Sequence, residues 1–499
     1  MNSSLTGSAA TAPPGALAQR HSVPRVPPVL IGALGVLAAL TTGRFLASGS
    51  FGLGVAVVLA AVYIPLVFVD LALAIALWAG LLYLRSLSVV SVGPTLIEIL
   101  LVVGWLGIVA TRRVRLRVLQ EHRLLVAAIV LCGCWLTVSV AWAEEPGKAA
   151  ASAGYWWMAI LAFAVVATTI RRPRDVRIVA LAFVIGAVIA VAIGFLGIGG
   201  QSAALKAREA GTRLVAAGGD PNYQAAGFLA AMFVAGGLIG VVKRPAARTL
   251  LPVALGFITL GFVATESRGG VLGLAFALVA AFLLLRHQRA RVLAWTLIAA
   301  AGLAVYLPFH HDALHRLTHF GGGGSGREDQ WTVAWRIFRA HPLFGVGLGN
   351  FTVLEPRYTL EPGPMTHVAI IAETPDIVHN TYLQLLAETG VIGLIVFLIV
   401  VAGSLRASWL AAKRFDAVGR EDYGDLARAV LIGTIGMLAA SFFLTNGNNF
   451  ELWILFALGP AMLTLAKGWH VEPPLASRLH GPSPVRSLPR KVTTDRRWS

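Results

Sequence analysis

The chain has 499 residues, of which 57% are hydrophobic and only 13% are charged, and its mean hydropathy is +0.75. A soluble protein of this length needs far more charged surface, so the composition excludes that class and indicates a membrane protein. The formal net charge of +17 raises nucleic acid as a partner. However, the basic residues form short clusters between apolar runs, which is typical of cytoplasmic loops, and we expect no nucleic-acid partner.

Residues 1–28 are rich in Ala, Ser and Pro and lack a cleavable-signal pattern, so we expect a disordered cytoplasmic tail there. Apolar runs then follow one another through residues 29–466. They predict an all-α fold, a polytopic membrane bundle of about 12 to 14 transmembrane helices that forms one unit. The candidate spans begin near Val29, Phe51, Leu71, Val89, Leu124, Ala151, Ile178, Pro221, Thr249, Val271, Val292, Val391, Arg428 and Leu452.

Basic clusters in the loops set the expected orientation. They lie at 112–117, 171–177, 243–248 and 286–291, and all of them fall on the same side when the N-terminus is cytoplasmic. This agrees with the bias of Lys and Arg toward cytoplasmic loops. We therefore expect a multi-pass protein of the bacterial cytoplasmic membrane, surrounded by membrane lipids, with residues 467–499 as a second cytoplasmic tail.

One expected extracytoplasmic loop, residues 309–390, is much longer than the others and holds most of the 12 histidines. A long loop is unusual unless it folds or has a function, so we look for the chemistry there. Thr374, Pro375 and Asp376 have the pattern of a helix start, which predicts His379 on the second helical turn near the outer membrane surface. Taken alone, a histidine in this position is more often structural than catalytic.

Three motifs stand out in the second half of the chain. The first is the run His379–Asn380 followed by Glu388, Gly390 and Gly393 at the start of a membrane helix. The second is Arg327 and Trp331 followed by the Pro-Leu-Phe-Gly-Val-Gly turn at 342–347, and the third is Ser267–Arg268–Gly269–Gly270 at the outer end of a helix. Together they resemble the O-antigen ligase and polymerase superfamily, over roughly residues 210–460.

The resemblance implies a glycosyltransferase that takes a glycan from a polyprenyl-diphosphate carrier and joins it to an acceptor hydroxyl on the outer face of the membrane. It implies no metal and no other cofactor. Such a reaction needs cations that stabilise the departing diphosphate and a base near the attacking hydroxyl. The expected acceptor is a lipid or a glycan. The shared motifs serve the donor, so they leave the acceptor open. We place ligation first, polymerisation of repeats second and transfer to a protein third.

By the same resemblance, Arg268, Arg327 and His379 are the expected catalytic residues. Ser267 is a candidate cap for the helix that begins at Arg268, so the guanidinium and the helix N-terminus would face an anion together. The alternative is an interfacial arginine that reaches the membrane surface or pairs with Glu266. For Arg327 the alternative is a solvated surface charge. His379 would act as a base or orient the hydroxyl.

Further candidates are less specific. Asn380 and Tyr382 are expected substrate-binding or orienting partners of the histidine. Arg213 is a weaker candidate for phosphate contact, because the Asp220–Pro221–Asn222 turn after it is more readily a helix cap. The series His311, His315 and His319 follows helical spacing and offers a metal site as a minority interpretation.

Rival functions were weighed from the positions of the charges. A secondary transporter places ionisable residues or broken helices at the bilayer midplane, and only Glu98 lies clearly within a span. A flippase for the same lipid needs a cationic cavity through the bundle, and the spans contain too few Arg and Lys. A scaffold gives the arginines and the histidine no role. The distribution favours chemistry at the outer face.

Overall fold

The computed structural model of the chain describes residues 40–45, 48, 51–85, 87, 94–111, 116–198, 213–216, 219–306, 327–363, 365, 368, 373 and 375–469. Within these residues every regular element is a helix, which confirms the predicted all-α class. The predicted span near Val29 begins outside the described residues. Most of the two predicted tails and the segment 307–326 of the predicted loop also lie outside them.

The helices follow one another from Phe51 to Lys467. They are α2 (Phe51–Val69), α3 (Leu71–Leu81), η1 (Leu82–Leu84), α4 (Pro94–Ala110), α5 (Arg117–Glu121), α6 (Arg123–Val138), η2 (Ser139–Trp142), α7 (Pro146–Thr169), α8 (Pro173–Phe195), α10 (Pro221–Val241), α11 (Pro245–Ala264), α12 (Arg268–Leu284), η4 (Arg286–Gln288), α13 (Arg289–Tyr306), α15 (Arg327–Ala340), α16 (Phe351–Thr359), α18 (Thr381–Ala417), α19 (Glu421–Ala440), η6 (Ser441–Phe443) and α20 (Phe450–Lys467).

Eight of the described helices are long and apolar enough to cross a membrane. A ninth span is added if Arg268–Leu284 and Arg286–Ala294, which are bent by 102°, count as one. Three further apolar helices, α2, α3 and α4, offer shorter apolar stretches. The polytopic helical bundle is thus confirmed, while the number of about 12 to 14 spans stays a prediction.

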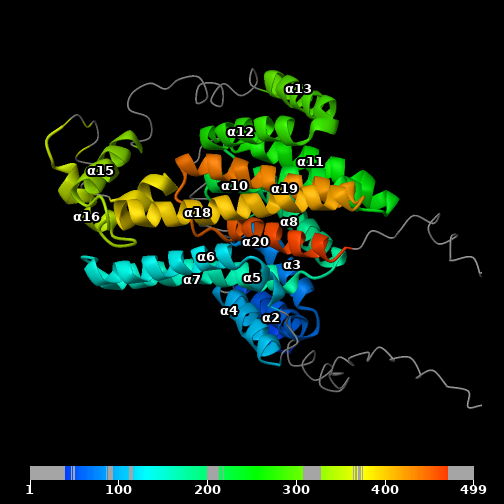
Figure 1. The fold of residues 1–499 in the computed structure, drawn as a ribbon, viewed down its shortest axis with the longest axis horizontal. Coiled ribbons are helices and arrows are strands. Elements are labelled where there is room, and N and C mark those ends of the chain that lie inside the picture. Colours follow the sequence, from blue (N-terminus) through cyan, green and yellow to red (C-terminus); the bar gives the residue numbers. More distant parts are fainter. Residues whose placement is uncertain are drawn as a thin grey trace, which may run out of the picture.

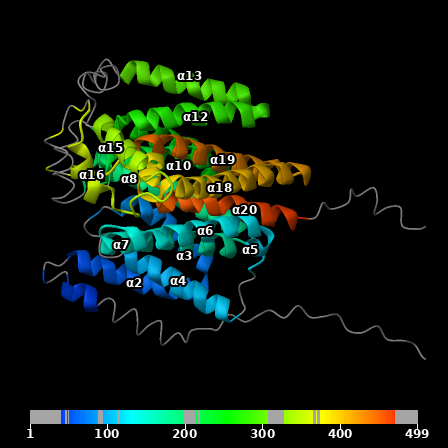
Figure 2. The ribbon, with the colours of Figure 1, turned by 60° about the vertical axis from the view of Figure 1, so that its left-hand side comes forward.

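The centre of the bundle is formed by α10, α18, α19 and α20. Helix α19 packs against α10, α12 and α18, and α18 also packs against α6 and α20. Close approach depends on small side chains, since a Cβ on Gly433 of α19 would lie 3.3 Å from the backbone of Ala230 in α10. Both ribbon views place α12 and α13 along one side of the bundle and α2 and α4 along the opposite side (Figures 1 and 2).

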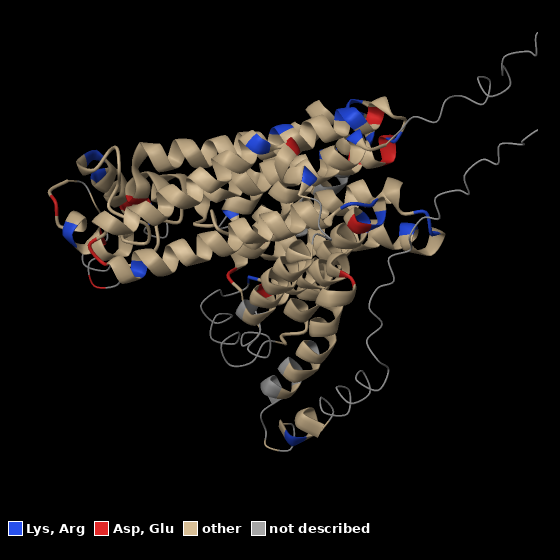
Figure 3. Cartoon of the chain, turned by 60° about the horizontal axis from the view of Figure 1, so that its bottom comes forward, with Lys and Arg blue, Asp and Glu red and all other residues tan. Residues whose placement is uncertain are grey.

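The two ends of the bundle differ in composition. Helices α15 and α16 lie at one end, beside the start of α18 (Figure 1), and we call this the site end. Lys and Arg gather mainly at the opposite end (Figure 3). Because Lys and Arg are enriched in cytoplasmic loops, this end is the one expected to face the cytoplasm, and the orientation stays a prediction.

A second, smaller hydrophobic cluster fixes α15 and α16 to the site end. It includes Val333 and Ile337 of α15, Phe351 of α16 and Val378, which are all at most 1% exposed. The apolar residues of α15 recur at helical spacing, so one face of this short helix is covered, and that face also holds the buried Asp329. The segments before α18 therefore form a folded cap on the bundle.

A kink in α18 connects this cap to the membrane helices. Gly390 has φ 67° and ψ −174°, which interrupts the helix. The glycine-rich turn at 342–349 lies against the kink, where the Gly347 N–H donates to the Glu388 carbonyl and the Val391 N–H donates to the Pro342 carbonyl. The Pro-Leu-Phe-Gly-Val-Gly segment noted in the sequence is therefore a backbone brace that satisfies the polar groups freed by the kink.

Candidate functional site

The helix that carries the histidine motif begins later than the sequence predicts. The side chain of Asn380 is the N-cap of α18 and accepts the N–H groups of Tyr382 and Leu383, each at 3.0 Å. His379 therefore precedes the helix, and the prediction that it lies on the second turn is wrong. Thr374, the expected cap, lies outside the described residues.

Contacts from distant segments hold residues 375–378 out of the helix. The Asp376 N–H donates to the buried carboxylate of Glu355 in α16 at 2.8 Å. The Trp331 indole N–H in α15 donates to the Val378 carbonyl at 3.1 Å. Because these bonds take up backbone groups that a helix would use, the chain stays non-helical until Asn380.

His379 has the geometry of a base with one free nitrogen. Its Nε2 lies 3.3 Å from Asp376 Oδ2, whereas Nδ1 is buried and has no hydrogen-bond partner among the described residues. Donation from Nε2–H to the carboxylate leaves Nδ1 as the acceptor. Burial, and next the positive charge of Arg327, lower the pKa of His379 from its ordinary value. The neutral imidazole is therefore favoured.

Arg268 is the first residue of α12, as the sequence predicts. Ser267 caps this helix by accepting the Gly270 N–H at 3.1 Å. The side chain of Arg268 is exposed at the site end. Just before it, Glu266 has φ 50°, and His379 has φ 52°; these are the two positive-φ residues other than glycine in the described part of the chain. Backbone strain of this kind clusters at functional sites.

Arg327 interacts electrostatically with both of the other predicted catalytic residues. Its side chain is half-buried. Burial lowers its pKa, and the charge of Arg268 lowers it further, while Asp220 and Asp376 act in the opposite direction. Since Arg327 in turn acts on His379, the three predicted catalytic residues belong to one charged cluster. The two aspartates offset part of its positive charge.

Three helix N-termini meet at this cluster. The starts of α10 and α12 are joined by the Ser267 hydroxyl, which lies 3.0 Å from Asn222 Oδ1. The starts of α10 and α18 bind neighbouring carbonyls of the α19–α20 turn, through the Tyr223 hydroxyl at 2.9 Å and the Thr381 hydroxyl at 2.6 Å. Helix N-termini carry partial positive charge and bind anions. The arrangement therefore suits a negatively charged ligand.

Arg213 lies beside the cluster with its guanidinium already engaged. Its Nε donates to the Thr265 carbonyl and its Nη2 donates to Asn222 Oδ1, each at 2.8 Å. Asp220 caps α10 by accepting the N–H of Asn222 at 2.7 Å, so the interpretation of this turn as a helix cap is confirmed. These contacts give Arg213 a role in holding the ends of α10 and α11 together.

Asn380 and Tyr382, the other predicted substrate-binding residues, have mainly positioning contacts. The Asn380 side chain is used as the cap of α18. The Tyr382 hydroxyl donates to the Leu438 carbonyl at 2.8 Å, and its ring lies 4.6 Å from that of Phe442. Asn380 thus fixes where α18 begins, directly after His379, and Tyr382 fixes this start against α19.

Sequence reasoning missed the acidic residues around the site. Asp376 stands three residues before His379, and this spacing was available as a signal for a partner. Glu355 gave none, because its link to Asp376 spans distant positions. Glu388 is buried and accepts the Phe351 N–H at 3.4 Å, which fixes the glycine-rich turn. The His311, His315 and His319 series lies outside the described residues.

The O-Antigen ligase family model matches residues 253–398. The resemblance to the O-antigen ligase superfamily is confirmed. The matched segment contains Arg268, Arg327 and His379, whereas Arg213 lies before it. No curated protein matches the chain. The O-antigen ligase match implies ligase- or polymerase-type glycosyl transfer in surface polysaccharide assembly, by an integral membrane protein.

Proposed function

We propose that the protein transfers a glycan from a polyprenyl-diphosphate carrier to an acceptor hydroxyl on the outer face of the bacterial cytoplasmic membrane. The observation that carries the proposal is the single cluster formed by Arg268, Arg327 and His379 at the meeting point of three helix N-termini. Such a cluster combines an anion site with a base. The O-antigen ligase match supports the same reaction class.

The diphosphate is the group that the cationic part of the cluster fits. Arg268 and Arg327 offer guanidinium groups, which bind phosphate oxygens in a planar, bidentate manner. The exposed Arg268 would contact the carrier first, and the half-buried Arg327 would stabilise charge that develops as the diphosphate leaves. The negative charges of Asp220 and Asp376 favour the charged form of Arg327.

His379 supplies the base in this scheme. The acceptor hydroxyl gives its proton to Nδ1, while Asp376 stabilises the imidazolium through Nε2. The hydroxyl oxygen forms a bond to the anomeric carbon of the glycan, and the bond from that carbon to the diphosphate oxygen breaks. Its electron pair leaves with the polyprenyl diphosphate. No oxidant, reductant or nucleotide sugar takes part in this balance.

The acceptor distinguishes ligation from polymerisation. Ligation joins the glycan to a lipid-borne core, and a polymerase joins it to a second carrier-linked repeat. We favour ligation, as the family match is to the O-antigen ligase description. The arginines and His379 serve the donor and the proton in either case.

A reconstituted reaction tests the proposal. The purified full chain in lipid nanodiscs would receive a polyprenyl-diphosphate glycan with a labelled sugar, plus either a lipid-core acceptor or excess carrier-linked repeat. We expect labelled product in one arm, and loss of transfer by roughly 10² or more in the variants His379→Ala and Arg268→Ala. Which arm gives product decides between ligase and polymerase.

A matched variant controls for nonspecific effects of removing an arginine. Arg339 lies in the last turn of α15, is exposed and is outside the cluster. Arg339→Ala should keep wild-type transfer. Full activity in His379→Ala and Arg268→Ala, at wild-type protein level, would contradict the site assignment.

A further inference from the structure

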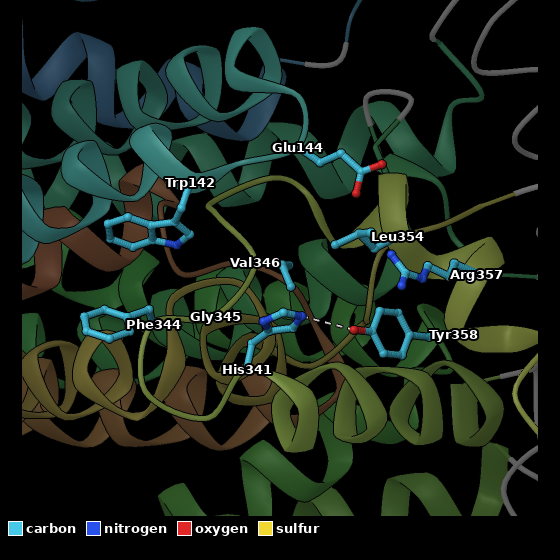
Figure 4. Close-up of a pocket in the computed structure, with 9 residues that line it drawn as sticks. All are labelled: Trp142, Glu144, His341, Phe344, Gly345, Val346, Leu354, Arg357 and Tyr358. Carbon is cyan, nitrogen blue, oxygen red and sulfur yellow. Dashed lines mark hydrogen bonds between the residues drawn. The ribbon is translucent and has the colours of Figure 1, made fainter.

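A cavity of about 580 Å³ lies at the site end, against one face of α16 (Figure 4). Leu354, Arg357 and Tyr358 of α16 line it. Glu355, on another face of the same helix, bonds to the backbone of Asp376. The cavity shares no lining residue with the charged cluster, and α16 contacts both. Its volume falls within the range of small-molecule sites, about 300 to 1,000 Å³.

One wall of the cavity is aromatic. The rings of Trp142 and Phe344 lie with their centroids 5.8 Å apart, and Trp135 lies 5.8 Å from each of them. The Trp135 indole N–H donates to the Thr389 carbonyl, so this group is anchored to α18. Phe344 is nevertheless 51% exposed, which leaves apolar ring surface open to a ligand.

The opposite wall carries polar groups of mixed type. His341 Nε2 lies 3.1 Å from the Tyr358 hydroxyl, and both side chains line the cavity. Glu144 and Arg357 project from its two sides (Figure 4), and neither forms an ion pair with a described residue. The cavity thus offers both donors and acceptors beside an aromatic face.

This combination selects one ligand chemistry. A diphosphate would need several cations, whereas Arg357 is accompanied by the acidic Glu144. An acyl chain would leave the charges of Glu144 and Arg357 without partners. A sugar ring has apolar C–H faces that pack on aromatic rings and hydroxyl groups around its edge that bind mixed donors and acceptors.

We propose that this cavity is a saccharide-binding subsite, placed to hold sugar residues of a substrate while the bond is made at the charged cluster. The identity of the ligand as a substrate sugar rests on the proposed function. Two sources share the chemistry, the glycan of the donor and the sugars of the acceptor. The glycine-rich turn contributes Gly345 and Val346 to the lining. The same turn bonds to the kink of α18, so it contacts both the subsite and the start of that helix.

Direct binding tests the subsite without relying on turnover. The full chain in nanodiscs would be titrated calorimetrically with two probes from the producing organism. One is the oligosaccharide freed from its carrier by mild acid, and the other is the delipidated core oligosaccharide. We expect one probe to bind the wild type and to bind about tenfold or more weakly to Glu144→Gln/Arg357→Ala. The probe that binds identifies the source.

Control variants separate this proposal from the proposed function. Both altered residues are exposed, so folding should be retained, and Trp142→Ala adds a test of the aromatic wall. His379→Ala should bind the probe as the wild type does, and so should Arg339→Ala. Failure of both probes to bind the wild type, or unchanged binding in Glu144→Gln/Arg357→Ala, would overturn the subsite. Loss or retention of transfer in His379→Ala bears on the reaction alone.

Discussion

Asp376 Oδ2 lies 3.3 Å from His379 Nε2, immediately before the cap of α18. This contact fixes which nitrogen of the imidazole remains to accept a proton. Asp376→Asn should reduce kcat/KM about tenfold to a hundredfold, because an amide no longer fixes the tautomer or stabilises the imidazolium. Protein level should stay unchanged, since the Asp376 side chain is 60% exposed. Glu373→Gln, an exposed change on the same segment, is the control; equal losses in both would argue against the pair.

Arg268→Lys should lose most transfer activity although it keeps the charge. A lysine ammonium is a point charge and cannot reproduce the planar fork of a guanidinium on a diphosphate. Arg268 is exposed at the first position of α12, so stability should change little. Transfer assays beside a measurement of protein abundance check this. Arg339→Lys should remain active, and wild-type turnover in Arg268→Lys would show that charge alone suffices.

Gly345→Ala should destabilise the protein by more than the cost of placing an alanine at a positive φ. Gly345 has φ 67°, and a Cβ there would lie 2.3 Å from the backbone carbon of Glu388. Gly419 has a similar φ of 72° with nothing within 4 Å, so Gly419→Ala isolates the conformational penalty of about 1 kcal/mol. Thermal unfolding of both variants in detergent compares the two. Similar melting temperatures would mean that the brace can relax around the added methyl group.

Local signals predicted the helix starts that depend on local contacts. Ser267 was expected to cap the helix at Arg268, and the structure has this bond. Asp220 was interpreted as a cap and is one. Both predictions succeeded because a cap side chain bonds to amides only two or three residues ahead, so the sequence contains the whole interaction.

Non-local contacts explain what the sequence could not predict. Asn380, and not Thr374, was found to start α18, because Glu355 and Trp331 hold residues 375–378 from segments far away in the chain. Tyr382 is predicted to bind substrate or orient the histidine, and the partner of its hydroxyl, the Leu438 carbonyl, lies far away in the sequence. The spacing of residues along one segment carries no information about either partner.

Glu355→Gln should make stability less dependent on pH. Burial raises the pKa of Glu355 from 4.5 to about 7. The folded protein therefore binds a proton at Glu355 more tightly than the unfolded chain does. This preference stabilises the fold fully below the unfolded pKa of 4.5, and the stabilisation is lost as the pH rises through about 7. Glutamine stays neutral and can still accept the Asp376 N–H. We expect equal melting temperatures at about pH 5 and a higher one for Glu355→Gln at about pH 8. A lower melting temperature for Glu355→Gln at the higher pH would mean that the charged carboxylate is the stabilising form.

Arg327→Met should move the acid limb of the pH–rate profile to higher pH. The positive charge of Arg327 lowers the pKa of His379, after burial, so its removal favours the protonated imidazole and raises that pKa. The base then becomes available only at higher pH, while the plateau rate also falls because a cation on the diphosphate is missing. The dependence of kcat/KM on pH, measured in nanodiscs for the wild type, Arg327→Met and Arg339→Met, separates these effects. Arg339→Met should follow the wild-type curve. An acid limb that stays in place in Arg327→Met, with only the plateau lowered, would mean that the arginine serves the phosphate without acting on the base.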